Sequence, residues 1–156
     1  KVEQMMSTNV KTCSPNDTLE IAAGIMWDHD CGIVPVVDPE GKAIGVVTDR
    51  DICMAGYTQG MQYWQIPVSV AASKKIFTIK PSDSLHKAEA VMRLHQVRRL
   101  IVVDDAGKVA GVLSINDLAR KAKHASDLSE VAQTLSAICQ TARHDENGSA
   151  KAAASA

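Results

Sequence analysis

The chain has 156 residues, a hydrophobic share of 46% and a formal net charge of −1. This length suffices for one compact domain or two small fused ones, and the sequence lacks the clustered Lys and Arg of a nucleic-acid-binding surface. No apolar run approaches the roughly 18–20 residues of a membrane span. The four cysteines are scattered and form no C-x-x-C pair, so we expect reduced thiols and a cytoplasmic protein.

The first third of the chain predicts the element order β-α-β-β-α. "NVKTC" is a short extended piece, and "SPNDTLEIAAGIMWDHD" is a helix because its apolar residues recur at helical spacing. "GIVPVVD" and "AIGVVT" are β-branched runs separated by the turn residues "PEGK", which predicts a hairpin. A short helix, Asp51–Ala55, closes the unit.

The same order returns after a linker. We expect the linker "YTQGMQYWQIP" to be an ordered loop whose aromatic side chains cover a core edge or a partner surface. Beyond it, "KIFTI" is extended, "KPSDSLHKAEAVMRLHQ" is helical, and "RRLIVVD" and "VAGVLS" flank the turn "DAGK". A short helix, Asp117–Ala122, ends this second unit.

A further helix is predicted over Ser126–Ala142, with Asp127 as its cap and Glu130 at the third helical position. It carries one apolar stripe that must be buried against the rest of the chain or a second chain, formed by Leu128, Val131, Ala132, Leu135, Ile138 and Ala142. We therefore divide the chain into a first repeat (1–56), a linker (57–67), a second repeat (68–123), a C-terminal helix (124–144) and a low-complexity tail (145–156).

The two units are copies of each other. With a shift of 66 residues, Val2–Ala55 aligns without a gap to Val68–Lys121, and 17 of 54 positions are identical. A copy of this size would have a marginal core alone. We therefore expect the copies to pack with pseudo-twofold symmetry into one α/β fold of the α+β type.

Both copies contain the pattern Gly-apolar-apolar-(Thr/Ser)-x-x-Asp, as "GVVTDRD" and "GVLSIND". Asp49 has no counterpart in the second copy, which disfavours magnesium or phosphoryl-transfer chemistry by Asp49 with Asp51. The shared residues have two interpretations. They are capping boxes, with Thr48 or Ser114 as the N-cap and an Asp at the third helical position. Alternatively, the hydroxyl contacts a phosphate at the helix start while the carboxylate accepts hydrogen bonds from a ribose.

Element order, spacing, duplication and motif together resemble a tandem CBS-domain pair, or Bateman module, over about Val2–Lys123. The similarity is greatest to small stand-alone bacterial CBS proteins. The resemblance implies a regulatory module, without a required cofactor, that binds an adenosine-containing ligand such as AMP, ADP, ATP, S-adenosylmethionine or NAD in clefts between the copies. It also implies a homodimer and a regulated protein whose identity the sequence does not give.

The resemblance also assigns residues to these clefts. Thr48 and Ser114 would contact phosphate or ribose, and Asp51 and Asp117 would bind the ribose. The base would lie against Thr12, Thr78, Val34, Pro35, Leu100 and Ile101. Arg98 and Arg99 replace Gly32 and Ile33 of the first copy. Since arginine suits phosphate, we expect the two clefts to be unequal.

Other functions remain open at this stage. The clefts could stay empty in a structural or protein-interaction module, so that the motifs serve only as caps. A metal or redox sensor could use the equivalent His29 and His95, or the pair Cys13 and Cys31. Neither set supplies a defined ligand spacing, so we predict no metal site. The sequence lacks a nucleophile-elbow or phosphate-loop pattern, and we predict that the chain is not an enzyme.

Overall fold

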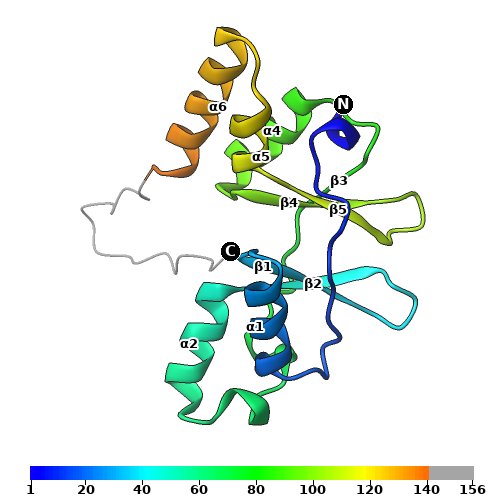
Figure 1. Cartoon of the computed structure of the whole chain (residues 1–156), viewed down its shortest axis with the longest axis vertical. Coiled ribbons are helices and arrows are strands. Elements are labelled where there is room, and N and C mark those ends of the chain that lie inside the picture. The colour runs from blue at the N-terminus through cyan, green and yellow to red at the C-terminus, as the bar shows by residue number, and fades with distance from the viewer. Residues whose placement is uncertain (141–156) are drawn as a thin grey trace, which may run out of the picture.

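The computed structural model of the chain describes residues 1–140, and these residues form two similar halves (Figure 1). The elements before the second repeat are η1 (Val2–Gln4), α1 (Leu19–Asp28), β1 (Ile33–Val37), β2 (Ala43–Thr48), α2 (Asp49–Gln59) and η2 (Tyr63–Gln65). Those that follow are α3 (Val68–Ala71), β3 (Thr78–Ile79), α4 (Leu85–His95), β4 (Arg99–Val103), β5 (Val109–Ser114), α5 (Ile115–Lys121) and α6 (Ala125–Ile138).

Each half is built on a β-hairpin. β1 pairs antiparallel with β2, and β4 pairs antiparallel with β5. In the second half, β3 adds a parallel strand beside β4. Its counterpart in the first half is a single parallel bridge from Cys13 to Val36. The predicted mixed α/β class and the β-α-β-β-α order are confirmed, with the first strand of the first copy reduced to this bridge.

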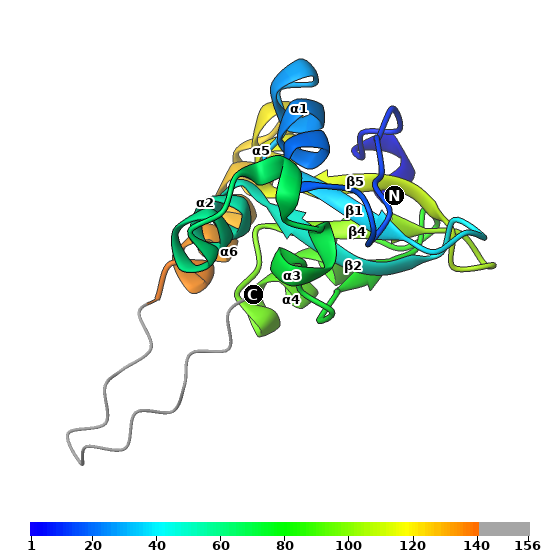
Figure 2. The same cartoon turned by 90° about the horizontal axis from the view of Figure 1, so that it is seen from below.

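The tips of the two hairpins meet across the pseudo-twofold axis. The backbone N–H of Ala43 donates to the carbonyl of Gly107 at 3.2 Å, and that of Val109 donates to the carbonyl of Gly41 at 3.3 Å. Both turn glycines have positive φ, 83° at Gly41 and 80° at Gly107, a conformation in which a Cβ is unfavourable. The two hairpins therefore run side by side, as Figure 2 shows from below.

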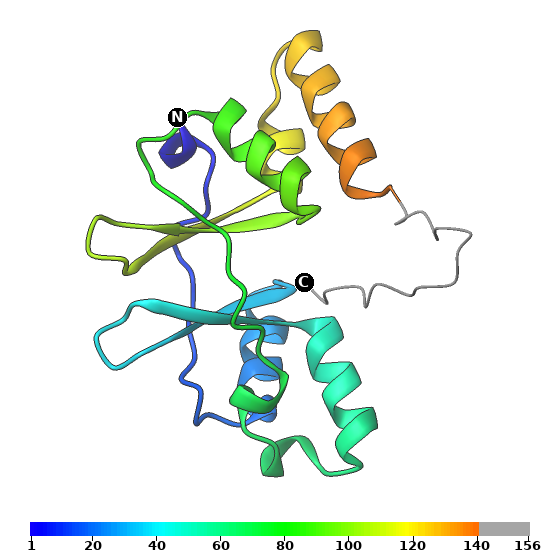
Figure 3. The same ribbon diagram turned by 180° about the vertical axis from the view of Figure 1, so that it is seen from behind.

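The two apolar cores exchange short segments between the halves. Val2, at the start of the first copy, is fully buried in the core of the second half. Ile66 and Val68 lie in the core of the first half, although Val68 begins the second copy. Figure 3 shows both crossing segments running between the halves. The predicted boundaries of the repeats describe the duplication in sequence, whereas the core of each half also includes residues from the start of the other copy or from the linker before it.

The α2 helix is longer than the sequence analysis expected. It runs from Asp49 through Gln59 and ends at Gly60, which has a left-handed φ of 60°. The predicted helix spanned only Asp51–Ala55. Gly56 instead lies inside the helix, where the ring of Tyr63 occupies the space that a Cβ would need. Tyr63 thus packs on α2, whereas Tyr57 is 82% exposed.

The C-terminal helix begins and packs differently from the prediction. Its N-cap is His124, and the carboxylate of Asp127 accepts the backbone N–H groups of Lys123 and His124, each at 3.1 Å. Asp127 is therefore at the third helical position, not the cap. The predicted stripe is split, because α6 touches α4 and α5 through Val131, Thr134 and Ile138 while Leu128, Ala132 and Leu135 are exposed. Ala142 lies outside the described residues.

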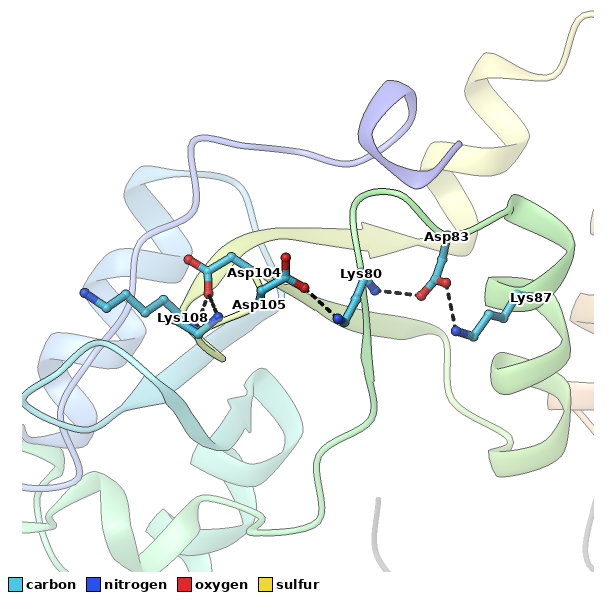
Figure 4. Close-up of polar contacts among 7 residues, drawn as sticks. Lys80, Asp83, Lys87, Asp104, Asp105 and Lys108 are labelled. Atoms are coloured by element: carbon cyan, nitrogen blue, oxygen red, sulfur yellow. Dashed lines mark hydrogen bonds and ion pairs between the residues drawn. The ribbon is translucent and has the colours of Figure 1, made fainter.

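Carboxylates stabilise the turns at one edge of the second half (Figure 4). Asp83 accepts the backbone N–H of Lys80 at 2.9 Å and forms an ion pair with Lys87 at 2.8 Å. These donors hold the pKa of the Asp83 carboxyl below its usual value, the Lys87 hydrogen bond most strongly. The same turn accepts the incoming N-terminus, since the backbone N–H of Val2 donates to the carbonyl of Asp83 at 3.0 Å.

Replacing Gly24 with Ala is expected to stabilise the protein. Gly24 lies within α1, and an added Cβ would meet no atom within 4 Å; the equivalent residue of α4 is Ala90. An alanine restricts the unfolded chain and favours helix by about 0.5–1 kcal/mol. Urea unfolding should show a higher midpoint with an unchanged slope. Gly41→Ala, at φ +83°, should lower the midpoint, and an unchanged midpoint in Gly24→Ala would contradict the argument.

Candidate functional site

Both copies of the shared motif form capping boxes, as predicted. In the first copy, the Thr48 hydroxyl accepts the N–H of Asp51 at 3.2 Å and donates to its Oδ2 at 2.6 Å, while the Thr48 N–H donates to the same oxygen at 2.9 Å. Ser114 and Asp117 repeat this arrangement, with distances of 3.1, 2.6 and 3.0 Å. Because the hydroxyl and carboxylate of each motif already form these local hydrogen bonds, the motif can cap its helix without binding a ligand.

The two capping boxes differ in what faces the second carboxylate oxygen. Asp117 is only 6% exposed, and its Oδ1 accepts a hydrogen bond from Arg120 at 2.7 Å. In the first copy, the residue equivalent to Arg120 is Met54, whose side chain cannot form an ion pair with Asp51. The Arg120 side chain is mostly exposed whereas Asp117 is buried, so the arginine can leave Asp117 only if another donor takes its place at Oδ1.

A cleft of about 740 Å³ opens beside Ser114 and Asp117. Its walls come from three parts of the chain: the crossing segment Met6–Lys11, the turn His29–Ile33 after α1, and the second copy through Arg99, Val112, Ser114, Asn116, Asp117 and Arg120. We call this the open cleft. Its volume lies within the roughly 300–1,000 Å³ of small-molecule sites, and it combines residues that lie more than 100 positions apart in the sequence.

Strand pairing brings Arg99 into the open cleft. Arg99 and Ser114 are directly opposite each other in the β4–β5 register, so their side chains share one face of the hairpin. Across the cleft, Gly32 leaves room for the arginine, because an added Cβ would lie 3.1 Å from its Nη2 and 3.0 Å from Oδ2 of Asp49. A larger residue at position 32 would displace one of these charged side chains.

The pseudo-symmetric positions beside Thr48 and Asp51 have different neighbours. Phe77, the counterpart of Lys11, stacks on His95 with ring centroids 4.0 Å apart. Gln96 donates to the carbonyls of Ala137 and Gln140 at the end of α6. Arg98, the counterpart of Gly32, donates to the sulfur of Cys139 at 3.9 Å. We call this region, formed by Phe77, His95, Gln96 and Arg98 beside Thr48 and Asp51, the mirror site. An aromatic stack and the end of α6 lie here at the positions that correspond to Lys11, Asp30 and Gly32 of the open cleft.

The structure brings three of the predicted site residues together. Ser114, Asp117 and Arg99 line the open cleft, and Thr48 and Asp51 form the same motif at the mirror site. Four of the predicted wall residues are buried, namely Val34, Pro35, Leu100 and Ile101. Thr12, Thr78 and Arg98 are exposed and do not line the open cleft. As ligand contacts, all of these residues stay predictions.

Sequence reasoning missed the crossing segment and Arg120. Ser7, Thr8 and Asn9 line the open cleft, but they belong to the other copy and precede its first strand. No local pattern marks them, because the exchange of segments is a tertiary feature. Arg120 had a usable signal, since it follows Asp117 by three residues on the same helix and residues at that spacing face each other.

The cysteines are all free, and Cys13 lies in the first core. Burial, with a smaller contribution from Asp17, raises the pKa of the Cys13 thiol to about 11. Since the thiolate is the reactive form, native iodoacetamide treatment at pH 8 should modify the exposed Cys53 and Cys139 and spare Cys13. Peptide mass spectrometry after treatment with and without urea checks this, and rapid native labelling of Cys13 would contradict it.

Within residues 1–140, no three His, Cys, Asp or Glu side chains gather closely enough to bind a metal ion. None of the helices in this part of the chain is long and apolar enough to cross a lipid bilayer.

Comparison with known proteins identifies the repeat. The CBS domain family matches residues 2–57 and again residues 68–124. The CBS domain-containing protein YhcV of Bacillus subtilis is 40% identical over 118 residues, which are 76% of this chain and 82% of that protein.

Solved structures of similar fold include two with ligands. The crystal structure of Hypoxic Response Protein I, with two coordinated zinc ions, has a TM-score of 0.70 and 27% identity, and the match covers 78% of this chain and 98% of that one. Mycobacterium tuberculosis has a protein of this name. The CBS domain pair of protein MJ0100, in complex with 5′-methylthioadenosine and S-adenosyl-L-methionine, has a TM-score of 0.69 and 24% identity over 76% of this chain and 92% of that one.

The duplicated β-α-β-β-α unit, its paired capping motifs and the two family matches all agree, and the chain belongs to the CBS domain family as a tandem CBS pair.

Proposed function

We propose that this CBS pair is a regulatory module that binds an adenosine-containing nucleotide in the open cleft and signals to a partner protein whether the cleft is occupied. The observation that carries the proposal is the open cleft itself, where the Ser114–Asp117 motif faces a cavity of about 740 Å³. The adenosine ligands of the similar MJ0100 domain pair support this ligand class.

The charges of the open cleft favour a ligand with a phosphate. Lys11, Arg99 and Arg120 line it together with two carboxylates, Asp30 and Asp117. Arginine binds phosphate through two parallel hydrogen bonds, and Arg99 lies next to the Ser114 hydroxyl in the strand register. A phosphate placed between Arg99 and Ser114 would be held by charge and by hydrogen bonds.

The ribose would be bound by Asp117. In the free protein, Oδ1 of Asp117 is occupied by Arg120. A bound phosphate offers Arg120 an alternative partner, which frees Oδ1 to accept hydrogen bonds from the ribose hydroxyls. Apolar contacts for the base come from Val10, Ile33 and Val112, which also line the open cleft.

A route for the signal starts at the same motif. Ser114 is the N-cap of α5, and α5 packs against α6. A ligand that shifts Ser114 and Asp117 would therefore move the surface on which α6 lies. This route and the protein that receives the signal are part of the proposal.

A nucleotide panel tests the ligand. We expect AMP, ADP or ATP to raise the thermal unfolding temperature of the full chain, and phosphate-free adenosine to do so less at equal concentration. A ligand at 100 times its dissociation constant adds about 2.7 kcal/mol to the free energy of unfolding. S-adenosylmethionine and NADH complete the panel. The absence of any shift at millimolar concentrations of every compound would overturn the proposal.

A protein-interaction module with an empty cleft is the second candidate. The α1–α2 face favours it, because Trp27 is 87% exposed and Tyr57 is similarly exposed, and aromatic residues are enriched at interfaces. The predicted homodimer would also need such a face. This alternative predicts no response to the nucleotide panel and a molecular mass by light scattering above that of one chain.

A further inference from the structure

A carboxylate that the proposed nucleotide site does not use lies at the edge of the open cleft. Asp49 is the first residue of α2, and its Oδ2 lies 3.0 Å from the point that a Cβ on Gly32 would occupy. Nη2 of Arg99 lies 3.1 Å from the same point. The two charged atoms are therefore no farther apart than these two distances combined, a range in which charged groups affect each other directly.

This approach of Asp49 to Arg99 joins the two halves of the molecule. Arg99 begins β4 in the second half, whereas Gly32 precedes β1 and Asp49 begins α2 in the first half. The strands of the two halves face each other in Figures 1 and 3. Oδ1 of Asp49 accepts the backbone N–H of Arg50 at 2.7 Å, so its other oxygen, Oδ2, is the one that lies beside Gly32.

The internal repeat shows that the capping motif does not require these charges. The motifs that begin at Thr48 and Ser114 form the same cap. By contrast, the residues around the contact differ in type between the copies, since Gly32, Asp49 and Arg99 correspond to Arg98, Ile115 and Ile33. Ile115 is buried in the second core, whereas Asp49 is exposed. The role of Asp49 therefore belongs to the open cleft and not to the cap or the core.

The charges of the open cleft are nearly balanced. Its wall contains three Lys or Arg side chains and two carboxylates, namely Lys11, Arg99, Arg120, Asp30 and Asp117. Asp49, beside Arg99, adds a third carboxylate at the edge of the cleft. Such a balance lets local contacts hold one phosphate, but it offers little attraction to further negative charge.

The position of Asp49 makes binding depend on the number of phosphates. In the proposed complex, the phosphate lies between Arg99 and Ser114. Each added phosphate brings more negative charge toward the guanidinium that Asp49 also faces, and like charges at this range repel each other. Adenosine, which carries no phosphate, is not subject to this repulsion.

We propose that Asp49 is a specificity-determining residue of the open cleft, where its carboxylate opposes the negative charge of added phosphates and makes the cleft prefer a nucleoside monophosphate to the triphosphate. This inference rests on the proposed nucleotide function and adds to it the class of nucleotide. Because Asp49 is exposed, water and salt screen its charge, so we expect a selectivity of a few-fold.

Isothermal titration of the full chain with adenosine, AMP, ATP and pyrophosphate, without divalent cations, tests the assignment. The wild-type chain should bind AMP more tightly than ATP. Asp49→Asn should raise the affinity for ATP and for pyrophosphate by about 3–10-fold, as expected for removal of one opposing charge at a solvated site. AMP should gain less, and adenosine should not change. The gains should shrink at about 1 M salt, where the Debye length is only about 3 Å.

Glu20→Gln is the matched control, because it also removes one negative charge from the exposed surface of the first half. It should keep the wild-type affinity for every compound. The Asn side chain in Asp49→Asn retains an oxygen that can accept the N–H of Arg50. We therefore expect α2 to stay folded, and thermal unfolding without ligand checks this.

Three results would overturn the inference. The first is a wild-type chain that binds ATP at least as tightly as AMP. The second is an affinity for ATP and pyrophosphate that stays the same or falls in Asp49→Asn. The third is an equal gain in Glu20→Gln, which would show that only the net charge matters.

Failure of the proposed function gives a different result, in which no nucleotide binds to the wild-type chain or to either variant. The pyrophosphate titration then still decides whether Asp49 opposes phosphate in the open cleft. Tighter binding of pyrophosphate to Asp49→Asn than to the wild-type chain supports that role. The absence of pyrophosphate binding, or of any difference between the two chains, overturns it.

Discussion

Replacing Asp117 with Asn is expected to weaken nucleotide binding by about 10–100-fold while the fold is retained. In the proposed complex, the carboxylate accepts charge-assisted hydrogen bonds from the ribose, each contributing roughly 1.5–3 kcal/mol, and every 1.4 kcal/mol is about tenfold in affinity. The Asn side chain keeps one oxygen, which can accept both the N–H and the hydroxyl of Ser114 as Oδ2 does, but it loses the negative charge and the second acceptor, Oδ1. We expect about 1 kcal/mol of lost stability from the altered cap.

Isothermal titration with the nucleotide that gives the largest thermal shift measures this loss. Asp51→Asn is the matched variant, because it changes the same atom of the same motif at the mirror site. We expect its affinity to stay near the wild-type value. Loss of binding in Asp51→Asn alone would place the ligand at the mirror site. Unchanged affinity in both variants would contradict any ribose contact by the motif.

Gly111→Ala should damage both the fold and the open cleft. An added Cβ would lie 2.7 Å from the carbonyl oxygen of Ser7 and 3.0 Å from the sulfur of Met6. Ser7 exchanges two backbone hydrogen bonds with Val112, at 2.9 and 3.0 Å, so this backbone cannot move away without losing them. Overpacking of this kind costs about 1–3 kcal/mol. Because Met6 and Ser7 also line the open cleft, the displaced segment should bind nucleotide less tightly.

Urea unfolding and titration of the same sample check the two effects together. Gly45→Ala is the control, since the equivalent contact with the Ser73 carbonyl is looser at 3.1 Å. It should cost less stability and leave nucleotide affinity unchanged. Equal stability of Gly111→Ala and the wild-type chain would show that the crossing segment adapts, and would contradict its proposed role as a fixed wall of the cleft.

Much of the fold follows from local patterns in the sequence. Alternating and β-branched runs around "PEGK" and "DAGK" place the two hairpins, and both turn glycines adopt the positive φ that such turns favour. The Thr48–Asp51 and Ser114–Asp117 caps form as the spacing indicates. The residues that form each turn or cap lie three or four positions apart. A single short segment of the sequence therefore contains all the information needed to predict each of these features.

The errors in the prediction lie where side-chain contacts decide the outcome. The helix predicted to end at Ala55 continues through Gly56 to Gln59, and the ring of Tyr63 packs against Gly56. Asp127 was predicted to be a cap, whereas its carboxylate reaches back to the N–H of His124 from the third position. The stripe of α6 was read as one buried face, yet Leu128 is 53% exposed and Thr134 is fully buried. The partner surface, which carries Arg93 and Glu89, determines which side of the helix is buried.

By itself, the sequence determined the duplication, the order of the elements and the two capping motifs, because each depends on local spacing or on a gapless repeat. The sequence also predicted unequal clefts, from Arg98 and Arg99 in place of Gly32 and Ile33, but only the tertiary structure decided which motif faces an open cleft. The crossing segment Met6–Lys11, at the start of the first copy, closes the open cleft beside Ser114 and Asp117, while Phe77, His95 and the end of α6 occupy the mirror site. The physical reason is that each cleft is built from both copies, so its shape depends on contacts between residues far apart in the chain.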